Sequence, residues 1–198
     1  MKKILFATNN KGKAREFKKI LSDLQLEVLT LNDFDFNEDI LEAGSTYEEN
    51  AAIKAKKGGE VSGLISFGDD TGMEVDALNG FPGLHSKRFA SGTDNDRNKL
   101  ILEKLKDIPG DKRNVKYIGV IAIYNPNTQE TEIFRGELSG IIALKPRGKN
   151  GFGYDPIFYL PKYKKTVAEL SDDKKNKISH RQKALIKAKE CLKKTMNL

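Results

Sequence analysis

Apolar residues occur along the chain in short runs and in helical patterns, and the two alternate. Short runs typical of buried strands occupy residues 4–7, 26–31 and 64–67. Between the first two runs, apolar residues recur at the spacing of one helix face: Phe17, Ile20, Leu21 and Leu24. Residues 46–49 form a capping box, which predicts a helix that ends near residue 57, before Gly58 and Gly59. This half of the chain therefore predicts strand–helix units.

The second half of the chain predicts more strand than helix. The pattern predicts a helix over residues 94–106 and a second capping box at residues 179–182 that begins the last helix. Strands are expected over four ranges, 73–77, 115–124, 131–138 and 140–145. This mixture of βα units and antiparallel hairpins indicates an α/β protein with a mixed sheet. The length fits a single domain over residues 1–198.

Composition excludes several classes of protein. The longest apolar stretch, around residues 117–124, is too short for a membrane span, and the N-terminal apolar run is too short for a signal peptide. The single cysteine, Cys191, rules out an intramolecular disulfide framework and a cysteine-rich metal site. We therefore expect a cytoplasmic protein with no membrane partner.

The charge is unevenly distributed along the chain. The net charge is +7, with twelve Lys or Arg against four Asp or Glu in residues 162–198, and seven acids without a base in residues 31–50. A basic segment could bind nucleic acid, but such patches usually interleave aromatics, and this one has only Tyr163. The alternative is one cleft that combines metal-binding carboxylates with phosphate-binding cations. We expect no stable nucleic-acid partner.

A polar loop, residues 8–13, separates the first strand from the first helix. The N-terminus of a helix presents backbone N–H groups and the positive end of the dipole, which together favour an anion. Gly12 allows a close approach of the backbone, and Lys13 supplies a point charge for a phosphate. The spacing is not that of a Walker A loop. The loop indicates either a phosphate site or an ordinary βα turn with an exposed lysine.

Two adjacent carboxylates, Asp69 and Asp70, stand between Gly68 and Gly72 at the expected end of a strand. Neighbouring carboxylates repel each other, so the pair is explained if a hard cation such as Mg²⁺ neutralises it and bridges to substrate phosphates. Adjacent residues of a strand point to opposite faces, which predicts that one of the two meets the metal. The alternative is a turn rich in Asp and Gly.

Two further segments carry candidate binding residues. In residues 151–156, Gly-Phe-Gly-Tyr-Asp-Pro, aromatic side chains between glycines suit a flat ligand such as a base, although a β-turn with apolar anchors has the same pattern. The other segment contains Lys175 and the pair His180-Arg181. Cations are unfavourable in the first turn of a helix, so this pair indicates a bound anion or a hydrogen-bond acceptor.

Taken in order, these segments resemble the inosine triphosphate pyrophosphatase family, from Lys3 to about Leu185. Seven motifs match in order: Thr-x-Asn-x-x-Lys from Thr8, Glu-x-Gly-x-Thr-aromatic-x-Glu-Asn-Ala from Glu42, Asp-Asp-Thr-Gly-x-x-Val-Asp-Ala-Leu from Asp69, Gly-x-Pro-Gly from Gly80, Gly-Phe-Gly-Tyr-Asp-Pro from Gly151, Ala-Glu-Leu from Ala168 and Ile-Ser-His-Arg from Ile178. Each motif alone is weak, but their order makes the resemblance strong.

The resemblance implies an elongated α/β fold with a long mixed sheet and two lobes flanking a central nucleotide-binding cleft. It also implies a homodimer that uses Mg²⁺ to hydrolyse ITP, dITP and XTP to the monophosphate and pyrophosphate. Glu42 and Asp70 would bind the metal, and Asp70 would act as general base. The residues that would contact the nucleotide are Thr8, Asn9, Asn10, Lys11, Gly12, Lys13, Thr71, Phe152, Gly153, Tyr154, Asp155, Lys175, His180 and Arg181.

The chain departs from the usual family pattern at three places. Thr71 stands where serine is common, Leu84-His85 replaces an aliphatic-Tyr pair, and Gly68 replaces an alanine, a change expected to matter little. The alternative enzyme class is a related pyrophosphatase that acts on modified pyrimidine or canonical triphosphates.

Overall fold

The computed structural model describes residues 1–36, 38 and 40–197. Its strands are β1 (Lys2–Phe6), β2 (Leu26–Thr30), β3 (Ser66–Val75), β4 (Pro82–Gly83), β5 (Asn114–Asn125), β6 (Glu130–Ile142), β7 (Phe158–Leu160) and β8 (Lys165–Thr166). Its α-helices are α1 (Lys11–Ile20), α2 (Tyr47–Ser62), α3 (Asp94–Lys104), α4 (Asp172–Ile178) and α5 (His180–Met196). None of the described helices is long and apolar enough to cross a membrane.

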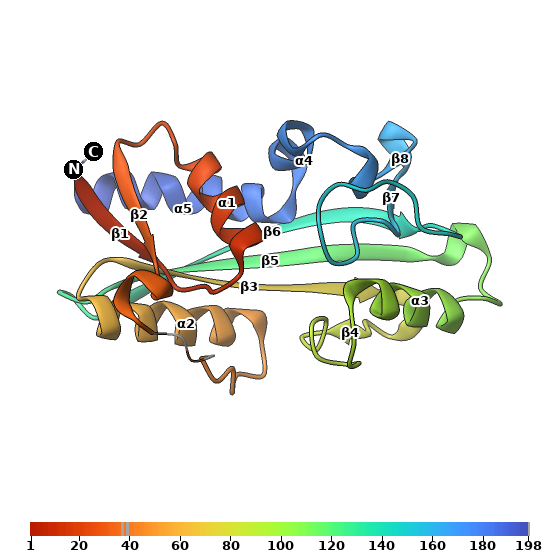
Figure 1. Ribbon diagram of the computed structural model, residues 1–198, viewed down its shortest axis with the longest axis horizontal. Coiled ribbons are helices and arrows are strands. Elements are labelled where there is room, and N and C mark those ends of the chain that lie inside the picture. Colours follow the sequence, from red (N-terminus) through yellow and green to blue (C-terminus); the bar gives the residue numbers. More distant parts are fainter. Residues whose placement is uncertain (37, 39, 198) are drawn as a thin grey trace. The chain divides into compact units, whose positions relative to one another are not determined.

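The described strands form one mixed sheet, as the sequence predicts. The strand order is β2-β1-β3-β5-β6-β7-β8, and β4 pairs with β3 outside this path. Strand β1 lies parallel to both β2 and β3, whereas β3–β4, β6–β7 and β7–β8 are antiparallel pairs. The parallel pairs join strand residues between 2 and 67, where the chain forms βα units, and these antiparallel pairs join residues between 73 and 166 (Figure 1).

The chain divides into two compact units. The first contains residues 1–70, 119–136 and 180–198, and the second contains residues 71–118 and 137–179. Strands β3, β5 and β6 each contribute residues to both units. The sheet and helices confirm the predicted α/β class, while the cleft expected between two lobes stays a prediction.

In the first unit, helices cover both faces of the sheet (Figure 1). Successive side chains of β1 point to opposite faces of the sheet, as in any strand. Ile4 and Phe6 pack with apolar residues of α1 and α5, including Phe17 and Leu185. On the opposite face, α2 contacts β1, and Gly58 allows this helix to approach Leu5 closely.

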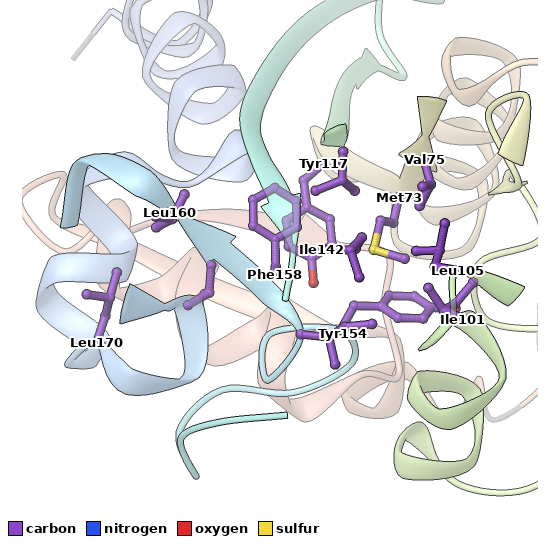
Figure 2. Packing of buried hydrophobic residues seen from close by; sticks show 13 residues of the cluster. Met73, Val75, Ile101, Leu105, Tyr117, Ile142, Tyr154, Phe158, Leu160 and Leu170 are labelled. Atoms are coloured by element: carbon purple, nitrogen blue, oxygen red, sulfur yellow. The ribbon is translucent and has the colours of Figure 1, made fainter. Parts of the chain in front are cut away.

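In the second unit, a core of buried side chains joins the strands to α3 (Figure 2). Met73 and Ile101 are completely buried in it. The rings of Tyr117 and Phe158 stack with their centroids 4.3 Å apart. Tyr154, which lies in the Gly-Phe-Gly-Tyr-Asp-Pro segment, belongs to this core, so the core fixes one side of that segment.

The largest errors in the predicted element boundaries occur at glycines. Helix α2 does not end before Gly58 and Gly59 but continues to Ser62, with Gly63 as its left-handed cap. A Cβ at Gly59 would lie 2.5 Å from the Tyr124 ring, so this glycine provides space for close packing. Similarly, β6 is a single strand through Gly140, where the sequence predicts two strands.

Gly68 is a further glycine for which the prediction is wrong. A Cβ at this position would overlap the carbonyl oxygen of Ala51 in α2. An alanine at this position would require α2 or β3 of this chain to shift, so we expect the substitution not to be neutral. The close approach matters because α2 and this part of β3 carry the charged residues described next.

Candidate functional site

The loop between β1 and α1 is held by its own side chains. Asn10 is the N-cap of α1, and its side-chain oxygen accepts hydrogen bonds from the backbone N–H groups of Gly12 at 2.9 Å and Lys13 at 3.1 Å. The backbone N–H of Asn10 in turn donates to the Thr8 hydroxyl at 3.1 Å. Two of the amides expected to meet an anion therefore bind Asn10 in this structure, and the loop has a defined shape.

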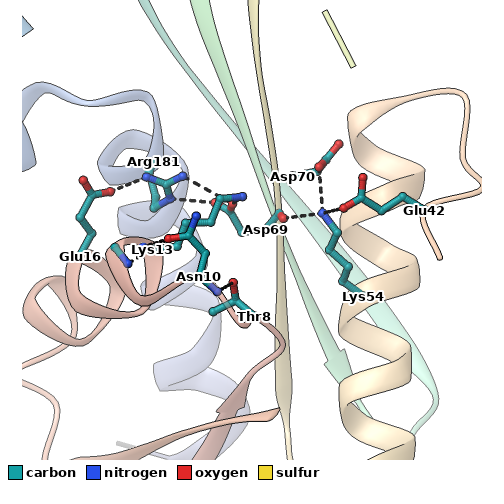
Figure 3. A network of polar contacts seen from close by, with 10 residues as sticks. Thr8, Asn10, Lys13, Glu16, Glu42, Lys54, Asp69, Asp70 and Arg181 are labelled. Carbon is teal, nitrogen blue, oxygen red and sulfur yellow. Dashed lines mark hydrogen bonds and ion pairs between the residues drawn. The ribbon is translucent and has the colours of Figure 1, made fainter. Parts of the chain in front are cut away.

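Asp69 and Asp70 lie inside β3 and not at its end, which corrects the predicted boundary. Both are buried, with 2% and 7% of their surface exposed. Their side chains point to opposite faces of the strand, as the alternation predicts (Figure 3). Asp69 faces residues of α1 and α5, whereas Asp70 faces α2.

On the Asp69 face, four charged side chains form a buried network (Figure 3). The Asp69 carboxylate forms ion pairs with the Lys13 ammonium and with Nε of Arg181, the latter at 2.8 Å. Arg181 also pairs with Glu16 of α1. Arg181 is only 2% exposed. Its positive charge, in the first turn of α5, is therefore neutralised by two carboxylates of the chain itself, those of Asp69 and Glu16.

The network changes the acidity of its members. Burial by itself raises the pKa of the Asp69 carboxyl, but Arg181 and Lys13 outweigh it and hold that pKa well below its usual range. Burial lowers the pKa of the Lys13 ammonium, and the neighbouring Asp69 offsets only part of this effect. Asp69 is therefore a fixed negative charge, while Lys13 loses its proton more readily than an exposed lysine.

On the Asp70 face, one ammonium group lies between two carboxylates. Nζ of Lys54 is 2.7 Å from Oε1 of Glu42 and 2.9 Å from Oδ1 of Asp70. It also donates a hydrogen bond to the backbone oxygen of Asp69 at 3.0 Å. Glu42 and Asp70, the two predicted metal ligands, thus converge on a single cation, although they are 28 residues apart in the sequence.

The second unit contains the Gly-Phe-Gly-Tyr-Asp-Pro segment of residues 151–156, called the aromatic loop below, and the candidate residues next to it. Asp155 accepts hydrogen bonds from the backbone N–H of Phe152 at 3.0 Å, from the Tyr117 hydroxyl at 3.3 Å and from Nζ of Lys175 at 2.7 Å. The same ammonium lies 4.3 Å from the centroid of the Phe152 ring. Lys175, from α4, therefore binds two of the side chains predicted to contact the nucleotide, Phe152 and Asp155.

The remaining candidate residues lie in defined positions of one unit or the other. Tyr154 donates its hydroxyl hydrogen bond to the backbone oxygen of Ser86, and burial raises the pKa of that hydroxyl. Thr71 is half-buried in β3. His180 is the first residue of α5 and is buried against Gly119, where any larger side chain would meet the imidazole.

Two residues of the networks, Lys54 and Glu16, have no predicted role from the sequence. Lys54 follows the spacing of the buried residues of α2, which include Asn50, Ala51, Ala55 and Gly58. A lysine at such a spacing signals a buried cation that needs an acidic partner. Glu16 occupies a comparable position beside the buried Phe17. The sequence alone does not tell which distant residue each would meet.

The carboxylates of the Asp70 face fit a hard cation. Among the described residues, no group of three or more His, Cys, Asp or Glu side chains could hold a metal. Mg²⁺ is commonly held by one or two carboxylates, with water and substrate phosphates as the other ligands. In this structure Glu42 and Asp70 both form ion pairs with the Lys54 ammonium, so the two carboxylates lie close enough to share one cation.

Comparisons with known proteins show which proteins this chain resembles over nearly its full length. A dITP/XTP pyrophosphatase of Symbiobacterium thermophilum is 44% identical over 191 residues, which cover 96% of this chain and 95% of the relative. A dITP/XTP pyrophosphatase of Bacillus cereus is 45% identical over 193 residues, with 96% and 94% covered.

The fold agrees as well. The solved structure of a HAM1 protein from Coxiella burnetii has a TM-score of 0.88 and 41% identity, and the match covers 98% of this chain and all of that chain. The model of the Ham1 family matches residues 4–191, which include both networks and the aromatic loop. The chain is therefore a member of the Ham1 family.

Proposed function

We propose that this protein hydrolyses non-canonical purine nucleoside triphosphates, namely ITP, dITP and XTP, to the monophosphate and pyrophosphate. The observation that carries the proposal is the identity of 44–45% with proteins named dITP/XTP pyrophosphatases over nearly the full chain. The two charged networks support it, because they combine carboxylates for a metal with cations for a polyphosphate. This activity would clear such nucleotides from the nucleotide pool.

The proposed metal is Mg²⁺, held by Glu42 and Asp70. Both side chains supply hard oxygen ligands and already lie within 3 Å of one cationic nitrogen, Nζ of Lys54. When bound, the metal would neutralise charge on the polyphosphate and favour a deprotonated water. Lys54 would then release at least one of its carboxylates, and its ammonium would be available to a phosphate oxygen.

Asp70 is the proposed general base. The water oxygen forms a bond to the α-phosphorus, the bond from this phosphorus to the oxygen that bridges to the β-phosphate breaks, and pyrophosphate leaves. The proton of the water moves to a carboxylate oxygen of Asp70. Lys13 and the loop that Asn10 holds would bind the triphosphate, with Thr8, Asn9, Lys11 and Gly12 as the other loop contacts.

The proposed base-binding residues are those that the family resemblance assigns to the nucleotide. Phe152 would stack on the purine and Asp155 would accept a hydrogen bond from its edge, with Thr71, Gly153, Tyr154 and Lys175 as further contacts. His180 and Arg181 would donate to the 6-carbonyl oxygen that hypoxanthine and xanthine share. Arg181 forms ion pairs with Asp69 and Glu16 here, so these carboxylates would set the orientation of its guanidinium.

The proposed function extends to the oligomeric state of the protein and to its location in the cell. We propose a homodimer in the cytoplasm, with no stable nucleic-acid partner. Light scattering at micromolar concentration tests the dimer. The salt dependence of binding to arbitrary DNA tests the nucleic-acid alternative, since a protein that contacts phosphates loses affinity steeply as salt is raised.

Release of pyrophosphate from a panel of nucleotides tests the function. We expect turnover of ITP, dITP and XTP that requires Mg²⁺ and stops with EDTA, and much weaker turnover of ATP. A preference for modified pyrimidine or canonical triphosphates would favour the alternative enzyme class. Orthophosphate and a nucleoside diphosphate as products would refute the proposed reaction.

A further inference from the structure

Asn98 is a buried amide with an uneven set of contacts. It lies in α3, and only 3% of its surface is exposed. Its Nδ2 donates a hydrogen bond to the backbone oxygen of Gly153 at 3.1 Å, across 55 residues of sequence. Its Oδ1 is buried without a hydrogen-bond partner in the described part of the chain. An amide with one unpaired end is a costly way to fill a core.

The free-energy cost of the unpaired Oδ1 is explained by the group that Nδ2 binds, the backbone oxygen of Gly153. Gly153 lies between Phe152 and Asp155, in a left-handed conformation with φ of +63°. Its backbone N–H donates to Oδ2 of Asp94, also in α3, at 2.8 Å. Side chains of one helix thus bind both backbone polar groups of this glycine: the Asp94 contact is the shorter of the two, and the Asn98 contact is the more buried.

Besides the core, which holds Tyr154, two helices hold the aromatic loop. Lys175 binds its side chains, through Asp155 at 2.7 Å and the Phe152 ring at 4.3 Å. Asn98 and Asp94 bind its backbone at Gly153. Gly153 has no side chain to restrict its backbone. The hydrogen bonds from α3 therefore help to fix the peptide groups on either side of it, together with the hydrogen bond from the Asp155 N–H to the Phe152 oxygen at 3.3 Å.

We propose that Asn98 is a positioning residue for base recognition, which sets the orientation of Phe152 and Asp155 by holding the Gly153 backbone oxygen. Asp94 assists from the surface of the same helix. This inference rests on the proposed role of the loop in base binding. It assigns to α3 a part in substrate selection that no residue of this helix has from the sequence motifs.

Asn98→Ala tests the proposal by comparing two ligands: ITP, which has a base, and inorganic pyrophosphate, which has none. We expect KM for ITP to rise about tenfold while kcat stays within about twofold, because loss of one buried hydrogen bond that orders a binding loop has this size. Inhibition by inorganic pyrophosphate should not change, since this ligand has no base. Asn95→Ala is the matched control, because Asn95 lies in the same helix and is exposed.

Two kinetic outcomes would overturn the inference. If Asn98→Ala weakened ITP and inorganic pyrophosphate equally, the residue would support the whole site and not the base loop. If KM were unchanged and only the active fraction fell, Asn98 would serve the stability of the core. Thermal unfolding of both variants separates that second case, because a core role lowers the Tm without moving KM.

Hydrogen exchange keeps the inference testable even if ITP is not the substrate. In the protein without ligand, Asn98→Ala should raise the amide exchange rate of a peptide covering residues 150–156 about tenfold, and Asn95→Ala should not. Unchanged exchange in this peptide would overturn the positioning role. Failure of the unsubstituted protein to hydrolyse ITP, with the exchange result as expected, would count against the proposed function alone.

Discussion

Replacement of Asp69 by asparagine should expose the energetics of the buried network. The substitution preserves the shape of the side chain but removes the negative charge between Lys13 and Arg181. Removing one partner of a buried ion pair typically costs about 3–5 kcal/mol, because the other charge stays buried without compensation. Arg181 retains Glu16, and asparagine retains one oxygen acceptor. We therefore expect a loss near the lower end, about 3 kcal/mol in the free energy of unfolding.

The loss should depend on pH in a direction that the structure fixes. Burial already lowers the pKa of Lys13 below 10.5, and Asp69 opposes this effect. Without Asp69, the pKa of Lys13 in the folded state falls further, while the unfolded chain keeps the ordinary value. Between the two pKa values the unfolded state binds more protons, so the free energy of unfolding rises with pH. The deficit of Asp69→Asn should therefore shrink as the pH rises from the lowered pKa of folded Lys13 toward 10.5.

Urea unfolding of Asp69→Asn and the parent, at several pH values, measures both effects. In a separate thermal unfolding experiment at neutral pH, the Tm should fall by roughly 6–12 °C, at about 2–4 °C per kcal/mol for a chain of this size. In the double variant Lys13→Met with Asp69→Asn, the pH dependence of the deficit should disappear. A loss below about 1 kcal/mol that does not change with pH would refute the account of the network as a desolvated set of ion pairs.

Three kinetic predictions follow from the proposed roles. Asp70→Asn should lower kcat at least about a hundredfold in the ITP assay at saturating Mg²⁺ and leave the circular dichroism spectrum unchanged; near-normal turnover would exclude Asp70 as base or essential ligand. Lys13→Ala should reduce kcat/KM for ITP and ATP alike, because a lysine on phosphate does not read the base. Arg181→Ala should reduce kcat/KM for ITP far more than for ATP, since a guanidinium has only donors and suits the 6-carbonyl; equal losses would make Arg181 a structural residue.

Local patterns in the sequence predict the first half of the fold well. Strand β1, the Asn10 loop and α1 follow from an apolar run, a polar loop and a helical stripe. The errors lie where packing outweighs local propensity. Gly58 and Gly59 are poor helix formers, but they remain in α2 because the strands approach so closely there that a side chain would not fit. A single sequence does not reveal such contacts.

The candidate site shows the same limit. Motif order identifies Lys13, Asp70 and Arg181, but not which of them meet. The structure pairs Lys13 and Arg181 with Asp69, to which the family resemblance assigns no separate role, and it places Lys54 between the proposed metal ligands. These contacts join residues more than fifty positions apart or on different elements, and their geometry depends on the sheet. Periodicity finds buried charges such as Lys54, whereas only the fold assigns their partners.

Hydrolysis of ITP in water enriched with ¹⁸O tests most directly where the bond breaks. Attack of water on the α-phosphorus places the label in the nucleoside monophosphate and leaves the released pyrophosphate unlabelled. Mass spectrometry of both products should show this distribution in the presence of Mg²⁺. Label in the pyrophosphate, or in orthophosphate released together with a nucleoside diphosphate, would contradict the account.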